Sequence, residues 1–306
     1  MSNIIWSFFA GWKWQPFLKR LPGFLLSSFG SLWLFAEIAS FFNEQAKQWI
    51  TSQWLAFGLA GILIAVCSGW PKTSFSYMLN GRDVKIEIRT GDAFRMSGAL
   101  IVPTNTTFDT DLGGLIARSP SIQGKLLRDY YDNRPEHLDL DIENELIKEG
   151  YPVKEVVVDK PGKKNRYELG SVIQIRKKDR FFYLLALTHI SNFGRATSSK
   201  DDFYIALARL WTYIMEHGDK CEIVIPVIGT GHARLTLKKE DVIKDIARSF
   251  IASCSEKTFC GKLTIAVYPA DLDKLDISEL DEFLKFSCKF AAFDSNVGPK
   301  VGLPLT

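Results

Sequence analysis

The pattern of apolar and polar positions divides this chain into two parts. Pro22–Phe42 contains one charged residue in about 21 positions, and Trp49–Trp70 contains none in about 22. Apolar runs of this length are typical of helices that cross about 30 Å of hydrocarbon. From Asp83 onward, short apolar segments instead alternate with charged ones. The pattern therefore predicts an all-α transmembrane hairpin followed by a globular domain.

The globular part shows the periods of both strands and helices. Val84–Arg89 alternates apolar and polar residues, which predicts a strand exposed on one face, and three apolar runs predict buried strands at Ala99–Pro103, Phe181–Thr188 and Cys221–Ile228. We expect further strands at Val153–Asp159, Arg166–Arg176 and Lys262–Tyr268, and helices within Leu112–Tyr131 and at Glu143–Glu149, Asp201–His217, Lys238–Ser253 and Ile277–Phe290. Strands that alternate with helices predict a mixed sheet covered on both faces, an α/β domain.

Composition shifts suggest five parts. We expect an N-terminal interfacial segment at 1–20, the hairpin at 21–71, a linker at 72–82, the α/β domain at 83–290 and a loosely held tail at 291–306. Trp and basic residues precede the first apolar run, as at a membrane interface, and basic residues also follow the second run, so both termini are expected in the cytoplasm. The alternative is a buried helical hairpin in a soluble domain.

Two features of the hairpin bear on its role. Glu37 lies inside the first apolar run, where a carboxylate either lines a pore or pairs in an oligomer, or reaches the headgroups. Small residues recur in the second run at a spacing that permits close helix contact, Ala56 with Ala60 and Gly61 with Ala65. We favour contact between the two helices of one hairpin over contact between subunits.

Charge and cysteine content exclude several classes. The formal net charge of +3 is too small to indicate nucleic-acid binding. The five Cys are irregularly spaced without a C-x-x-C pair, which predicts reduced thiols and no metal site. We find no P-loop and no Ser-His-Asp spacing, and we predict neither a catalytic residue nor a cofactor.

Glycines follow two of the predicted strands. Gly113-Gly114 comes after Ala99–Pro103, and Gly229-Thr230-Gly231 comes directly after Cys221–Ile228. Glycines let the backbone approach a ligand closely, and successive N–H groups there can bind phosphate. In open α/β sheets, ligands bind outside the carboxyl ends of the strands. The two loops therefore predict a pocket for a phosphorylated ligand.

Residues 83–290 resemble a divergent macro domain, the ADP-ribose-binding module with a three-layer α/β/α sandwich and a mixed sheet. The resemblance lies in Gly91-Asp92, in Ile101–Asn105 with Leu112–Ala117, and in Pro226–Gly231. It implies that Asp92 bonds the adenine amino group, that Asn105 bonds a ribose and that both glycine loops hold the diphosphate. The implied ligand-binding residues are Asp92, Ala93, Asn105, Gly113, Gly114, Leu115, Gly229, Thr230, Gly231, His232, Ala233 and Arg234.

The sequence departs from that family in ways that bear on function. His232-Ala233-Arg234 stands where the family usually has an aromatic residue and then Gly, which leaves space near Ala233 for a larger ligand. We expect His232 and Arg234 to set specificity, because Arg grips phosphate with two parallel hydrogen bonds. Read without the family, Asp92 is a cap or turn residue and Asn105 closes a turn.

A hairpin joined to a macro-like domain resembles the membrane effectors of type II Thoeris anti-phage systems. That resemblance implies a bacterial inner-membrane, multi-pass protein with a cytoplasmic macro domain. A partner TIR-domain protein would make an ADP-ribose-derived signal, a histidine conjugate, that the macro domain binds. The other partners would be the lipid bilayer and further copies of the chain. Signal binding would cause oligomerisation, membrane disruption and cell death. The alternatives are a membrane-tethered ADP-ribosyl hydrolase and an anchored scaffold with a degenerate pocket.

Overall fold

The computed structural model describes residues 15–69, 74–110, 121–157, 162–190, 196–228, 237–291 and 293. The chain forms two compact units, Met1–Thr73 and Ser74–Thr306. Each unit is described by itself below.

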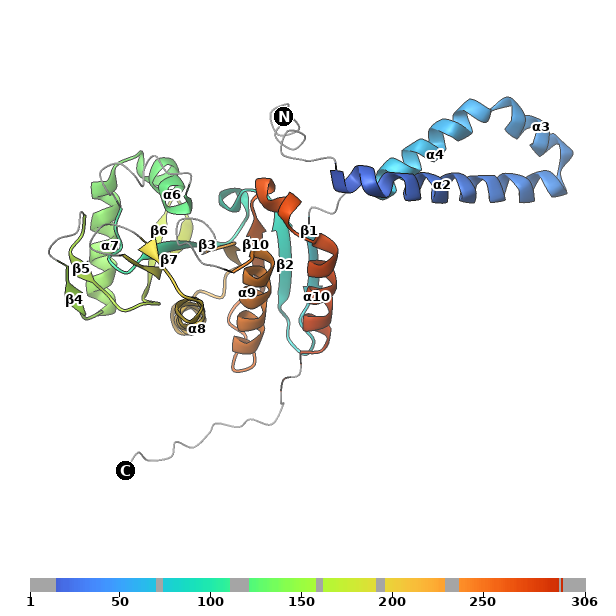
Figure 1. Cartoon of the computed structure of the whole chain (residues 1–306). Coiled ribbons are helices and arrows are strands. Elements are labelled where there is room, and N and C mark those ends of the chain that lie inside the picture. The colour runs from blue at the N-terminus through green and yellow to red at the C-terminus, as the bar shows by residue number, and fades with distance from the viewer. Residues whose placement is uncertain are drawn as a thin grey trace. The chain divides into compact units, whose positions relative to one another are not determined.

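Three helices make up the described part of the N-terminal unit: α2 (Gln15–Phe42), α3 (Glu44–Ser52) and α4 (Trp54–Gly69). Helices α2 and α4 pack against each other (Figure 1). Within the described residues, Leu21–Phe42 is long and apolar enough to cross a membrane, by length and composition only. The apolar helix Trp54–Ser68 is shorter than a spanning helix requires.

The second apolar run is not one continuous helix, contrary to the prediction. The predicted turn Asn43–Gln48 and the beginning of that run form α3 instead. The Asn43 side-chain oxygen accepts a hydrogen bond from the Gln45 N–H at 2.9 Å, and Glu44 adds negative charge to the first turn, so this sequence starts a helix of its own. The remaining 16 residues of α4 reach about 24 Å at about 1.5 Å per residue.

Small residues on α4 allow the close contact with α2. A Cβ atom on Gly61 would lie 2.8 Å from Cε1 of Phe29, so a larger residue here would require the Phe29 ring to move. Ala65 on the same face is 0% exposed. Gly61 and Ala65 thus lie at a contact within one chain, as favoured, whereas Ala56 is exposed. The outer faces of both helices expose large apolar side chains, among them Leu26, Trp33, Phe35, Phe41, Trp54, Leu59 and Leu63.

The second unit is built on a mixed sheet with the strand order β1-β2-β10-β9-β3-β7-β6. Strands β2, β10, β9, β3 and β7 run parallel to one another, and β1 and β6 pair antiparallel at the two ends of this order. The strands are β1 (Ser74–Met78), β2 (Lys85–Thr90), β3 (Ala99–Asn105), β6 (Val172–Lys177), β7 (Arg180–Ile190), β9 (Ile223–Pro226) and β10 (Lys262–Val267), and β8 (Ala196–Thr197) pairs with β7.

Helices cover both faces of the sheet (Figure 1). One face packs on α8 (Lys200–His217), α9 (Lys239–Ser253) and α10 (Ile277–Lys289), with Trp211 and Phe250 among its buried side chains. The other packs on α6 (Ile122–Tyr131) and α7 (Pro135–Glu149). Short 3₁₀ helices η1 (Ala93–Arg95) and η2 (Pro269–Lys274) follow β2 and β10. The predicted three-layer α/β/α arrangement with a mixed sheet is confirmed.

Two stretches differ from their predicted structure. Ser74–Met78, expected within the linker, is a strand because Phe75 and Tyr77 alternate with serines and pack against the core. The strands expected at Val153–Asp159 and Arg166–Arg176 do not form one hairpin. Strands β4 (Glu155–Val156) and β5 (Asn165–Arg166), of two residues each, pair antiparallel with each other. Strand β6 follows them and pairs with β7 instead.

Candidate functional site

The parallel strands gather polar and aromatic residues at one edge of the sheet. Their carboxyl ends meet there, and ligands of open α/β sheets bind at this edge. The residues at or just beyond these ends are Asp92 after β2, Asn105 in β3, His189 in β7, Ile228 after β9 and Tyr268 after β10. Of the predicted site residues, the structure thus brings Asp92 and Asn105 to the same edge.

Asp92 is a helix cap and an ion-pair partner at once. Its Oδ1 accepts a hydrogen bond from the Phe94 N–H at 3.1 Å, which caps η1. Its Oδ2 accepts a hydrogen bond from Nζ of Lys125 in α6, and Nε of Arg95 lies 3.7 Å away. The Asp92 side chain stays 28% exposed. Because a carboxylate offers about four lone-pair positions, it can still accept an amino group.

A hollow of about 370 Å³ lies beside Asp92 and Lys125. The rings of Phe94 and Tyr130 form part of its wall, with centroids 6.0 Å apart. The Nζ atoms of Lys125 and Lys178 lie over these rings, at 5.2 Å and 5.5 Å from the respective centroids. Lys125 was not anticipated from the sequence, because it contacts Asp92 only through the packing of α6 against the sheet.

Asn105 ends β3 at an irregularity in its pairing with β7. Its side chain is 8% exposed, and its Oδ1 accepts hydrogen bonds from the N–H groups of Thr107 at 3.0 Å and Asp109 at 3.3 Å. The turn-closing role considered for Asn105 is therefore present. No hydrogen bond of its Nδ2 is found among the residues that the structure describes, so both N–H groups of the amide can serve a ligand.

Hydrogen bonds anchor the chain after Asn105 as far as Thr110. Asp109 is 0% exposed, its Oδ1 accepts a hydrogen bond from the Lys163 N–H at 2.7 Å, and its carbonyl accepts one from Gln123 in α6. Thr110 donates to Asp139 of α7 at 2.7 Å. Buried charge needs such partners. This network fixes the chain where it leaves the sheet edge.

Arg180, at the start of β7, holds the segment that carries Asp92. Its guanidinium donates to four backbone carbonyls: Gly98 at 2.9 Å, Phe94 at 2.6 Å, Ala93 at 3.2 Å and Met96 at 2.9 Å. Ala93, a predicted site residue, is 5% exposed and contributes this carbonyl. Ala93 therefore offers almost no side-chain surface, and the ligand contact expected there stays a prediction.

Tyr268 is a candidate that the sequence reasoning missed. It follows β10, which lies between β2 and β9 in the sheet, and its side chain is 65% exposed at the edge where Asp92 also lies. A large aromatic face exposed at a ligand edge is suited to stacking on a base. The signal was present in the sequence, because the last predicted strand ends at this tyrosine.

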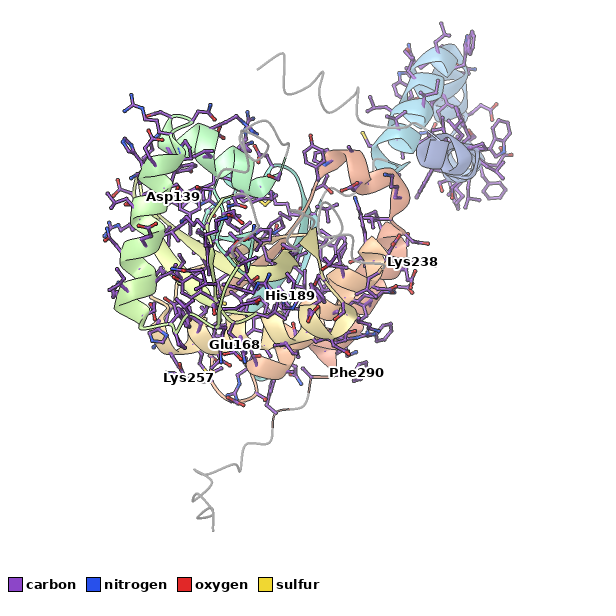
Figure 2. All side chains as sticks on the ribbon, turned by 60° about the vertical axis from the view of Figure 1, so that its left-hand side comes forward. Asp139, Glu168, His189, Lys238, Lys257 and Phe290 are labelled. Atoms are coloured by element: carbon purple, nitrogen blue, oxygen red, sulfur yellow. The ribbon has the colours of Figure 1, made fainter. Side chains whose placement is uncertain are left out.

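His189 lies at the same edge and contacts α8 (Figure 2). Its Nε2 lies 3.5 Å from Oδ1 of Asp202, and the His189 side chain is 47% exposed. Burial of Asp202 opposes its ionisation, but hydrogen bonds from Ser199 and the neighbouring His189 outweigh burial and lower the pKa of Asp202. His189 is therefore an oriented edge residue that is half open to solvent.

The other predicted site residues lie outside the described residues. They are Gly113, Gly114, Leu115, Gly229, Thr230, Gly231, His232, Ala233 and Arg234. Helices α6 and α9 begin soon after these two segments, at Ile122 and Lys239. Among the residues that the structure describes, no group of three or more His, Cys, Asp or Glu side chains could hold a metal ion.

Comparison with known proteins gives a consistent family. The sequence model described as Thoeris protein ThsA, Macro domain, matches residues 86–268. A Thoeris protein ThsA of Bacillus amyloliquefaciens (strain Y2) is 28% identical over 216 residues, which cover 68% of this chain and 69% of that protein.

Solved macrodomains of Oceanobacillus iheyensis also match. A mutant form has a TM-score of 0.40 at 15% identity and covers 72% of this chain and 95% of its own. A form with MES bound has a TM-score of 0.42 at 17% identity and covers 71% of this chain and 97% of its own.

Proposed function

Because this chain belongs to the macro-domain family of the Thoeris proteins ThsA, we propose that it is an anti-phage defence effector whose macro domain senses an ADP-ribose-derived signal. The signal is a histidine–ADP-ribose conjugate supplied by a TIR-domain protein. Its binding causes copies of the chain to assemble and to disrupt the bacterial inner membrane. The protein acts as a sensor and does not turn its ligand over.

The observation that carries this proposal is the collection of ligand-type groups at the carboxyl edge of the sheet. The Asp92 carboxylate accepts the adenine amino group, and the Tyr268 ring stacks on the base. The Asn105 amide donates to a ribose hydroxyl. The glycines in 111–120 and 229–236, two segments that follow β3 and β9 in the sequence, hold the diphosphate. The conjugated group takes the space near Ala233.

The N-terminal unit supports the membrane part of the proposal. Helices α2 and α4 expose apolar side chains over their outer faces, such as Trp33 at 72% and Leu63 at 67%. A patch of this extent on a soluble protein would drive association, whereas in a bilayer it faces lipid. The basic residues that flank the two apolar runs favour a cytoplasmic position for both termini and the macro domain.

Signal binding acts by shifting populations. The ligand must bind the assembling form more tightly than the resting form, because equal affinity for both forms would shift nothing. A change from 1% to 99% assembled requires a preference of about 10⁴-fold. The groups at this edge supply such a preference if they close around adenine, ribose and diphosphate in the assembling form and not in the resting form.

Calorimetric titration of the full chain in detergent micelles tests the function. The ligands are ADP-ribose, NAD and an ADP-ribose–histidine conjugate, and mass spectrometry analyses each ligand after the titration. Tight binding of the conjugate, recovered intact, is the expected result. Recovery of cleaved conjugate would identify a membrane-tethered ADP-ribosyl hydrolase, and the absence of heat with all three ligands would leave a scaffold without a sensor.

A further inference from the structure

Helix α7 exposes a stripe of alternating acidic and aliphatic side chains. Glu136, Leu140, Glu143 and Ile147 recur at helical spacing on the outer face, and Leu140 and Ile147 are 59% and 79% exposed. The opposite face of α7 buries Leu138, Ile142 and Leu146 in the core. The stripe therefore points away from the sheet. We call Glu136, Leu140, Glu143 and Ile147 the acidic stripe.

Helix α10 exposes the complementary composition at its C-terminal end. Phe286 and Phe290 are 55% and 68% exposed and stack with their ring centroids 5.9 Å apart, and the exposed Lys285 and Lys289 lie beside them. A hollow of about 490 Å³ lies alongside, between these lysines and the segment from Tyr77 to Gly81. We call Lys285, Phe286, Lys289 and Phe290 the basic stripe.

The two stripes cannot meet within one chain. Helix α7 packs against β6 and α10 packs against β1, and these strands are the two ends of the sheet order. The helices also belong to opposite layers of the sandwich. Figures 1 and 2 show them at opposite ends of the domain, with Asp139 of α7 far from Phe290 at the end of α10.

We propose that the acidic stripe of one copy of this chain docks on the basic stripe of another. Each stripe combines a charge with two apolar groups. Glu143 lies between Leu140 and Ile147, and Lys289 lies beside Phe286 and Phe290. Opposite charges across the contact give specificity, while the apolar groups supply the burial. The contact is head-to-tail, so it leaves a free stripe at each end and repeats into a ring or an open chain.

The geometry favours a second copy over a lipid surface as the occupant of the basic stripe. The chain enters the domain at Ser74, which pairs with Arg89 at the carboxyl edge of the sheet. Helix α10 begins after β10 at that edge and ends at the other one, where Asn80 donates to the Cys288 carbonyl. The aromatic end of α10 therefore lies at the edge away from the point where the apolar N-terminal unit is attached.

Charge exchange tests the interface in the full chain. Glu143→Lys and Lys289→Glu each place like charges across the contact and should each reduce self-association by tenfold or more. The double variant should recover association. Because the contact is head-to-tail, a mixture of the two single variants should also assemble, through alternating copies. Controls are Glu256→Lys and Lys257→Glu, exposed reversals in the turn after α9 that lie on neither stripe (Figure 2).

Self-association is measured by energy transfer between labelled copies in vesicles, with and without added ADP-ribose–histidine conjugate. The proposed interface specifies the contact through which copies assemble, and it rests on the proposed function. A wild-type chain that stays monomeric in both conditions overturns both. Association that neither reversal weakens overturns the interface alone. In a further outcome, Lys289→Glu loses association, Glu143→Lys alone does not, and the double variant does not recover it. This result would assign the basic stripe to anionic lipid and also overturns the interface.

Discussion

At the scale of single residues, Asp92 is expected to dominate the recognition of adenine. Asp92→Ala removes the acceptor for the amino group and should weaken ADP-ribose binding tenfold or more, because a hydrogen bond to a charged group contributes about 1.5–3 kcal/mol. Binding of ribose 5-phosphate, which lacks adenine, should not change. Both are measured by calorimetric titration. Asp129→Ala, in the wall of the neighbouring hollow, is the matched control.

Tyr268 carries a second prediction at this scale. Stacking of a base on an aromatic side chain contributes about 1–3 kcal/mol, so Tyr268→Ala should weaken ADP-ribose binding about tenfold. Tyr268→Phe keeps the ring and should bind like the wild type, because its hydroxyl is not needed for stacking. Equal losses in the two variants would assign the role to the hydroxyl. Equal affinities in all three chains would remove Tyr268 from the site.

The sequence indicated Asp92 and Asn105 through their resemblance to motifs of the macro-domain family, and the structure places both at the carboxyl edge of the sheet, just after β2 and at the end of β3. Lys125 and Tyr268 were missed because their places depend on tertiary structure. Lys125 reaches Asp92 across 33 positions of chain, and Tyr268 enters the site because β10 lies between β2 and β9.

At the scale of elements, the start of α8 holds a capping box with a pH-dependent contribution. The Ser199 N–H donates to Asp202 at 2.8 Å, and the Asp202 N–H donates to the Ser199 hydroxyl at 3.1 Å. The pKa of Asp202 is lowered in the folded chain. The stabilisation is therefore present above the unfolded pKa of about 3.9 and is lost as the pH falls through the folded value.

Asp202→Asn should lower the free energy of unfolding by about 1 kcal/mol at pH 7, because it weakens this cap. Chemical denaturation of the full chain in detergent measures the difference. The difference should begin to shrink as the pH falls below about 4, where the carboxylate of the unfolded chain becomes protonated, and should continue to shrink through the lower folded pKa. Asp201→Asn, at the exposed neighbouring position, serves as the control. A difference that is constant from pH 7 to pH 3.5 would contradict the argument.

Predicted elements were most accurate where one face is fully buried. The strands of the sheet core and helices α8, α9 and α10 appear within a few residues of their predicted bounds. Helix α7 is longer than the predicted Glu143–Glu149. The prediction fell short because Leu140 and Ile147 are apolar on the exposed face, which obscures the usual division into an apolar and a polar face. Strand β1 was not predicted, because its five residues mix serine with aromatic side chains.

At the scale of the whole molecule, a short stretch of chain joins the macro domain to the apolar N-terminal unit. Residues 70–73 connect α4 to β1. Two kinds of coupling are possible in principle. A conformational change can pass through β1 into α4, or assembly of the macro domains can raise the local concentration of the apolar helices. The complementary stripes on α7 and α10 favour the second.

The two couplings differ in their response to linker length. Insertion of four Gly-Ser residues between Pro71 and Lys72 would uncouple a rigid connection, whereas an assembly mechanism tolerates it, because doubling a flexible connection costs only about 0.6 kcal/mol. We expect the lengthened chain to bind the conjugate like the wild type and to stay toxic in cells that receive the signal. Glu143→Lys in the same lengthened chain should abolish toxicity, and Thr73→Ser controls for substitution within the linker. Loss of toxicity in the lengthened chain, with binding and self-association intact, would instead require that the signal travels through β1.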